Sequence, residues 1–188
     1  RMAKPSYLPA EVTTYWDPDE GRVVQPAGSI LQVQHFQYTA ANLPSLAAKT
    51  DTLLSNVQVN ITPQSSTSII HLQAHMFVEF SPDGNSHDHV FFFYRDSTKL
   101  AHAPAGVRRV GISMATRTYS AGDANSTPLI ARYDYFDQPN TTSQITYTVG
   151  VTVNAAGTIG INRTIGDTDE INSYERGISM ISATEISG

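Results

Sequence analysis

The chain has 188 residues, a net charge of -5, a pI near 5.6 and no cysteine. This length suits one well-buried domain, and the acidic balance without any long basic run argues against a nucleic-acid partner. Without cysteine there is no disulfide and no thiolate metal site, and no apolar run is long enough for membrane insertion, so burial and backbone hydrogen bonds must hold the fold.

The first 27 residues are interpreted as an extended N-terminal arm. They contain four prolines and an acidic cluster and show no sustained hydrophobic period. Trp16, the single tryptophan, lies in this arm, and a large aromatic in a loose segment usually docks on something. Two alternatives stand: packing on its own domain, or docking on a neighbouring subunit. We take residues 1–27 as the arm and residues 28–188 as the domain.

A strict two-residue period over residues 68–80 predicts the central strand. Its even-numbered residues from Ile70 to Phe80 are all apolar, while the odd positions include two histidines, a glutamine and a glutamate. Such alternation is typical of a strand with one face on a core. A second alternating run, residues 53–61, precedes it across a turn-rich segment, so we expect the two runs to form an antiparallel hairpin.

Residues 89–94 form a continuous apolar run without a polar face, and such a strand must be covered on both sides. The cover is either a second sheet and a loop, or another subunit. Because the run exceeds what one buried sheet face requires, Phe91, Phe92 and Phe93, together with Trp16, are candidates for a subunit interface. A closed cyclic assembly would bury such a strip.

Further strands are expected along the rest of the chain. The first covers residues 28–38, with a phase slip at His35–Phe36 that a bulge would cause, and a hairpin loop is expected at residues 154–157. The other alternating runs are residues 108–117, 129–135, 145–153, 159–161 and 178–186. About nine or ten strands at this spacing predict an all-β fold, an antiparallel β-sandwich of jelly-roll type, and no segment demands a helix.

The sequence carries no motif for catalysis and implies no cofactor. Nucleophile-elbow, phosphate-loop and His-Glu-x-x-His patterns are all missing. Paired carboxylates stay open, since a sandwich assembles them from distant strands that the sequence does not align.

One loop cluster resembles a binding site, formed by Asp83, Asn85, His87, Asp88 and His89. Alternate residues of an extended segment point the same way, so His87 and His89 could present two imidazoles to one cation, with Asp83 supplying oxygen. A simple polar loop is the alternative, and for so short a motif it is favoured, so no metal is assigned.

Several stretches, in order along the chain from Gly28 to Ile186, resemble a family of small β-sandwich domains found in tail fibres and other virion structural proteins of bacteriophages. The matching stretches are residues 28–33, 61–63 with 65–68, 95–98, 137–139 with 141–142, 145–149, 161–163 and 176–179. The resemblance implies a non-enzymatic virion protein, either a fibre or spike domain for host attachment or a capsid decoration protein.

The resemblance also implies sandwiches packed around a threefold axis, so we expect a homotrimer. Other virion proteins would be contacted through the arm, and a host-surface glycan is a further candidate ligand. A secreted carbohydrate-binding module and a small glycan-degrading enzyme are the alternatives. The arm favours assembly into a larger particle, and the lack of catalytic motifs disfavours the enzyme.

Overall fold

The computed structural model describes residues 15–17, 22–81, 88–115, 126–169 and 174–188. The strands are β1 (Tyr15–Asp17), β2 (Arg22–Val24), β3 (Ile30–Tyr38), β4 (Ser45–Leu46), β5 (Thr52–Ile61), β6 (Ile69–Ser81), β7 (His89–Arg95), β8 (Thr98–Leu100), β9 (Ser113–Ala115), β10 (Leu129–Asp137), β11 (Ile145–Thr152), β12 (Gly157–Ile161) and β13 (Ser179–Ile186). These ranges contain no helix, so none that could cross a membrane, and the all-β prediction is confirmed.

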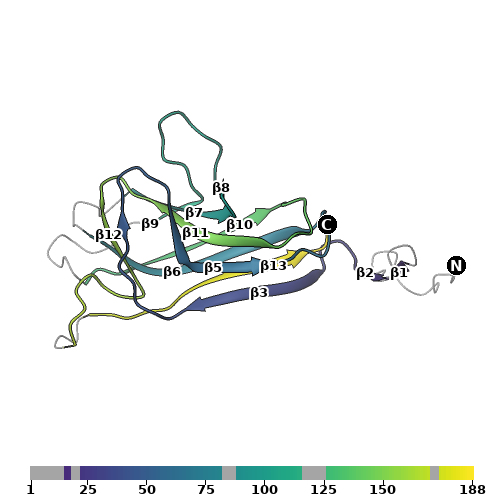
Figure 1. Ribbon diagram of the computed structural model, residues 1–188, viewed down its shortest axis with the longest axis horizontal. Helices are drawn as coiled ribbons and strands as arrows, with labels where there is room; N and C mark the ends of the chain where they lie inside the picture. Colours follow the sequence, from purple (N-terminus) through teal and green to yellow (C-terminus); the bar gives the residue numbers. More distant parts are fainter. Residues whose placement is uncertain (1–14, 18–21, 82–87, 116–125, 170–173) are drawn as a thin grey trace.

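The strands form two sheets that face each other across one core (Figure 1). The larger sheet has the order β3-β13-β6-β12-β4, with β10 also paired to β6, and the smaller has the order β5-β11-β7-β8, with β9 also paired to β7. Every pairing of named strands is antiparallel. The antiparallel sandwich is therefore as predicted, with 11 strands in its two sheets where nine or ten were expected.

A separate two-stranded ribbon, β1–β2, lies beyond the end of the sandwich at which the C-terminus is found (Figure 1). The backbone N–H of Gly28 donates to the carbonyl of Ser187 at 2.7 Å, which fixes where the ribbon's connection joins the sandwich. The division into an arm of residues 1–27 and a domain of residues 28–188 stays a prediction.

The central strand β6 has the alternation that the sequence predicts. All six even-numbered residues from Ile70 to Phe80 are at most 6% exposed and belong to the core. Across the core they face apolar residues of β5, β7 and β11. Inward-facing side chains of both sheets thus form the core of the sandwich.

Two hairpin predictions are wrong. Strand β5 pairs with β11, whereas β6 pairs with β10, β12 and β13, so residues 62–68 cross from one sheet to the other. In the same way, residues 153–156 lead from β11 in the smaller sheet to β12 in the larger one. Both strands of each pair have an apolar face, and in opposite sheets these faces can meet across the core.

The irregularity in the first strand is also misplaced by the sequence pattern. Glu185 lies opposite Gln32 and Ile186 opposite Ile30, so the extra residue is Leu31 rather than a residue at His35–Phe36. One residue of β13 then faces two of β3, as in a β-bulge.

Candidate functional site

The predicted binding loop is only partly described, since Asp83, Asn85 and His87 lie outside the described residues. His89 is 1% exposed, and its ring stacks on Phe80 with 3.5 Å between centroids. The carboxylate of Asp88 lies 3.0 Å from the guanidinium of Arg109. Within the described ranges no three His, Asp or Glu side chains are grouped so as to hold a metal ion. His89 therefore belongs to the core side of β7.

The aromatic run on β7 is covered by the chain itself. Phe91, Phe92 and Phe93 are each 0% exposed. Phe91 and Phe93 face the larger sheet, where their ring centroids lie 5.9 and 4.8 Å from that of Tyr133. The expectation that these three residues form a subunit interface is corrected. The second sheet covers one side of β7 and the chain's own side chains cover the other, so no surface of the three rings is accessible to a neighbouring subunit.

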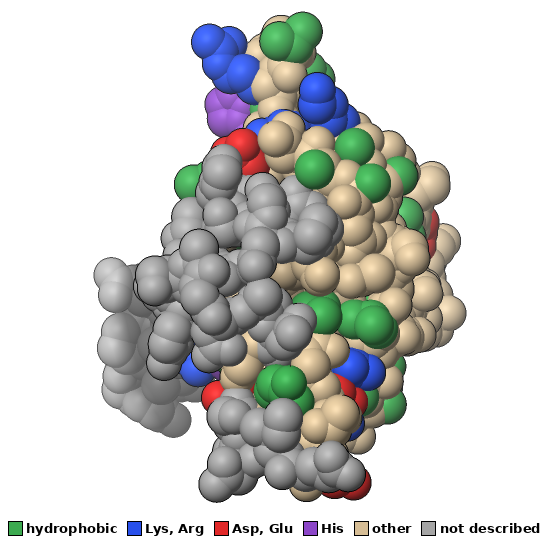
Figure 2. Space-filling view, turned by 90° about the vertical axis from the view of Figure 1, so that its left-hand side faces the viewer, with side chains coloured by type: hydrophobic (Ala, Val, Ile, Leu, Met, Phe, Trp, Pro, Cys, Tyr) green, Lys and Arg blue, Asp and Glu red, His purple; other side chains and the backbone are tan. Residues whose placement is uncertain are grey.

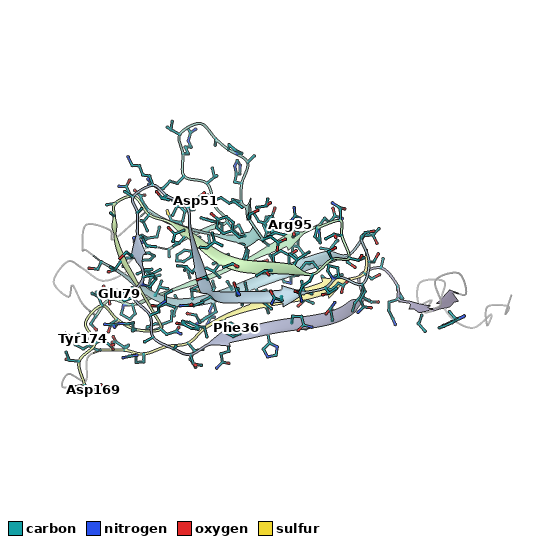
Figure 3. The ribbon with its side chains drawn as sticks, viewed as in Figure 1. Phe36, Asp51, Glu79, Arg95, Asp169 and Tyr174 are labelled. Atoms are coloured by element: carbon teal, nitrogen blue, oxygen red, sulfur yellow. The ribbon has the colours of Figure 1, made fainter. Side chains whose placement is uncertain are left out.

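Phe92 points to the outer face of the smaller sheet, where a lysine closes over it. The Nζ atom of Lys99 lies 3.9 Å from the ring centroid, and the same ammonium lies 3.0 Å from both carboxylate oxygens of Asp51. Gly150 on the adjacent strand leaves room for the ring, since a Cβ there would stand 2.3 Å from it. An ion pair over an aromatic ring thus seals this face near Asp51 (Figure 3).

Three buried carboxylates are engaged in hydrogen bonds within the chain, and two of them, Glu79 and Glu185, hold connecting segments. Glu79, 1% exposed, accepts hydrogen bonds from the backbone N–H and hydroxyl of Thr127, at 2.7 and 2.6 Å, and from the N–H of Ile165 at 2.6 Å. Glu185, 0% exposed, accepts from Gln64 N–H at 2.6 Å and from the Ser68 hydroxyl at 2.7 Å. Each carboxylate therefore ties a connecting segment to the larger sheet.

The third carboxylate, Asp137, accepts from the guanidinium of Arg95 at 3.0 and 3.1 Å and from the hydroxyl of Tyr147 at 2.6 Å. Burial, and then the hydrogen bond to this carboxylate, raise the pKa of Tyr147 well above its ordinary value. Glycoside hydrolysis needs two carboxyl groups open to one substrate. Because Glu79, Glu185 and Asp137 are buried, they do not supply such a pair. Glu79 also lies in a different part of the sandwich from Arg95, the ion-pair partner of Asp137 (Figure 3).

The outer face of the larger sheet is instead open, and it holds a groove of about 530 Å³. Residues directly opposite one another in a ladder share a face, so the register places two rows of side chains here. The rows are Gln37, Met180, His75 and Arg132, and, one step along the strands, His35, Ser182, Gln73 and Asp134. All eight line the groove, and they come from β3, β13, β6 and β10.

The groove is bordered by ordered side-chain contacts. The Nε–H of Arg132 donates to Nδ1 of His75 at 2.8 Å. Burial, and second the charge of Arg132, lower the pKa of His75 below its ordinary value. The ring of His71 stacks on Phe136 with 4.3 Å between centroids and 11° between planes, and its Nε2 lies 3.4 Å from the carboxylate of Asp134. The face therefore combines a stacked aromatic pair with polar and charged groups.

A second surface feature is the connection between β8 and β9, which projects from the sandwich (Figure 1). Figure 2 shows basic (blue) and histidine (purple) side chains at the top of the molecule, where this connection lies. Val107 there is fully exposed. The guanidinium of Arg109 forms an ion pair with Asp88 and donates a hydrogen bond to the side-chain oxygen of Asn154 at 2.9 Å. This connection covers Val90 on the outer face of β7, since a Cβ on Gly111 would stand 2.1 Å from the Val90 side chain, and the N–H of Ile112 donates to the carbonyl of Phe91 at 2.8 Å.

Sequence reasoning placed His71 and His75 on an outward strand face but did not connect them with β10 and β13. Arg132 and Asp134 stand at the polar positions of the alternating run 129–135, so the signal was present. What the sequence lacks is the strand order that places β10 and β13 on either side of β6.

Comparison with known proteins gives little. No family model and no curated protein matches the chain. A crystal structure of the infectious bursal disease virus VP2 subviral particle is similar with a TM-score of 0.41 and 10% identity, over 93% of this chain and 45% of that one. A structure of the Gx strain of the same virus gives a TM-score of 0.37 and 11% identity, over 91% and 45%. The chain spans less than half the length of either, and both likenesses are too distant to indicate a shared function.

Proposed function

We propose that the chain is a non-enzymatic structural protein of a virion, acting as a homo-oligomer in a bacteriophage fibre, spike or capsid-surface decoration. The observation that carries this proposal is that the buried carboxylates and the accessible polar side chains of the larger sheet lie in different environments. The carboxylates buried within the described residues are committed to hydrogen bonds inside the chain, while the outer face of the larger sheet carries accessible polar and charged side chains. Such a face supports binding and assembly, and the ordered resemblance of the sequence to phage virion domains supports the setting.

The arm fits the same proposal. Trp16 is 61% exposed and lies opposite Val23 in the ribbon, so the ribbon does not bury it. An exposed tryptophan on a projecting ribbon is the kind of side chain that anchors protein interfaces. We propose that the arm joins the domain to other virion proteins through Trp16, and that the domain itself is trimeric.

The test is to look for the protein in the particle. Virions purified from the source should contain the chain by mass spectrometry, and antibodies against the recombinant domain should label intact particles in electron micrographs. A chain found free in the medium and missing from purified virions would overturn the virion assignment.

A carbohydrate-binding module is the second candidate, favoured by the groove. Planar polar side chains such as Gln73, beside the stacked pair of His71 and Phe136, match the mixture of hydrogen bonding and stacking that sugar rings require. An oligosaccharide array incubated with the labelled chain tests it. Retention that Gln73→Ala abolishes supports the module, and release of reducing ends from the same sugars would instead support an enzyme.

A further inference from the structure

Exposed apolar side chains are concentrated on the outer face of the larger sheet. Cross-strand register places five large ones there, each 44 to 66% exposed: Ile30, Val33, Ile130, Phe136 and Met180. A cluster of this kind on a protein surface marks an interaction site more often than it marks free surface.

Three of the five, Ile30, Val33 and Phe136, lie toward the end of the face beside the arm, whereas Met180 lies in a groove row opposite His75 and Ile130 lies beyond the groove. Val33 and Phe136 lie in the row of Thr184 and His71, and Ile30 lies in the row of Ile186, next to the point where the arm joins β3. The following two rows, which line the groove, contain Arg132 and Asp134. The face therefore has an apolar end beside the arm and a polar band further along.

We propose that copies of this chain associate through the outer face of the larger sheet, with the apolar end nearest the symmetry axis. The inference rests on the homo-oligomer proposed above and names the surface that forms it. It replaces Phe91, Phe92 and Phe93, which are buried, by residues that are exposed.

Charge complementarity favours a second copy as the occupant. The chain carries a net charge of -5, so two copies repel each other in general. Arg132 and Asp134 stand two residues apart on β10 and point to the same side, so the face offers both signs of charge. Around a threefold axis, Asp134 of one copy can then lie against Arg132 of the next.

Symmetry decides which end lies at the axis. Near a rotation axis each residue meets its own equivalents, which apolar side chains tolerate and like charges do not. Ile30, Val33 and Phe136 are compatible with that position, whereas Arg132 and Asp134 fit away from the axis, where unlike residues meet.

The arm is continuous with this surface. The β1–β2 ribbon, which exposes Trp16 and Val23, leads directly into β3 beside Ile30, and it extends past that end of the sandwich (Figure 1). Joining copies at this end gathers the ribbons on one side of the particle, where each exposed Trp16 stays available to other virion proteins.

The smaller sheet supplies matched controls. Met114 and Leu53 lie on its outer face and are 59% and 44% exposed, against 58% for Phe136 and 44% for Met180. The four variants Phe136→Glu, Met180→Glu, Met114→Glu and Leu53→Glu therefore introduce the same charge at equal exposure on the two faces.

Size-exclusion chromatography with light scattering of the full chain at micromolar concentration measures the outcome. We expect about three chains per particle for the unmodified chain and both smaller-sheet variants, and single chains for Phe136→Glu and Met180→Glu. Far-UV circular dichroism should show the same β-sheet signal in all five proteins.

Each other result overturns the inference. If both larger-sheet variants stay assembled, the outer face of the larger sheet is not the interface, although the chain is still an oligomer. If all four variants dissociate, the effect is not specific to this face. An unmodified chain that is single overturns the face and the oligomer together; if Gln73→Ala then also releases it from an oligosaccharide array, the face belongs to a glycan. The virion assignment is tested separately, by the content of purified particles.

Discussion

The outer faces of the two sheets differ although both sheets bury their inner faces in one core. On the smaller sheet Phe92 is fully buried beneath Lys99 of β8. On the larger sheet Phe136, also an outward aromatic, is 58% exposed and stacks on the ring of His71. The same residue type is thus core on one face and surface on the other, and the covering segment makes the difference.

The larger sheet shows the same contrast along a single strand. The outward positions of β6 run from His71 through Gln73 and His75 to Glu79. Glu79 is buried because the segments at Thr127 and Ile165 close over it, while Gln73 is exposed where no described segment crosses the sheet. The open part of this face is therefore limited by loops at one end and reaches the arm at the other.

The largest expected effect tests the comparison between the two outward aromatics. Phe92→Ala should lower the free energy of unfolding by about 3–5 kcal/mol, as a buried large-to-small change, whereas Phe136→Ala should change it by less than about 0.5 kcal/mol in separated chains. Urea unfolding at concentrations where the chains do not associate measures both. Equal losses at the two sites would mean that both outer faces are covered.

The next effect compares the two faces of β6. Leu72→Ala removes a fully buried side chain and should cost about 2–5 kcal/mol, while Gln73→Ala on the outward face should be nearly neutral. The two residues are neighbours on one strand, so backbone differences are small. If Gln73→Ala were the more damaging change in urea unfolding, the assigned inward and outward positions would be reversed.

Strand identity could be predicted from the sequence because it depends on local alternation. The even positions of β6 and the odd positions from Ile145 to Val153 are buried as the pattern indicates. The pattern failed where a bulge shifts the phase: in β5 Leu54 is buried and Leu53 is exposed, opposite to the expected alternation with Val57. A bulge changes which face a side chain takes and leaves the residue types unchanged.

Which strands pair could not be predicted, since it is a non-local property. A turn between two strands looks alike whether it closes a hairpin or crosses to the opposite sheet. The crossing at residues 62–68 is fixed by Glu185, whose carboxylate accepts hydrogen bonds from Gln64 and Ser68 more than 100 residues away in sequence. The site depends on the same long-range order, because Arg132 meets His75 only when β10 lies beside β6.

A smaller effect tests how the loop end of the outer face is closed. Glu79→Gln keeps the shape of the side chain but removes the charge from three hydrogen bonds, so it should lower the free energy of unfolding by about 1–3 kcal/mol. Asp134→Asn, on the open part of the face, is the control and should stay within about 0.5 kcal/mol. Thermal or urea unfolding checks both. A neutral Glu79→Gln would mean that the loops at Thr127 and Ile165 hold without the charge.

The smallest expected effect is a pH dependence at His75, on the open part of the face. Burial and the neighbouring Arg132 lower the pKa of His75 in the folded chain below 6.5, the value it has when unfolded. Between those two values the unfolded chain binds more protons, so the contribution of His75 to stability is complete above about pH 6.5 and is lost as the pH falls below it. Protonation would also remove the acceptor that Nδ1 offers to Arg132.

The groups facing His75 are Arg132 and Asp134 on β10, His71 on its own strand, and uncharged Met180 on β13. All of them remain in His75→Gln, so the difference between the two proteins isolates the histidine. Urea midpoints measured at about pH 7.5 and about pH 5.5 should fall further for the unmodified chain than for His75→Gln. A steeper fall in His75→Gln would contradict the prediction, because it would show that the folded state favours the protonated ring of His75. The open face would then carry an additional positive charge at acid pH.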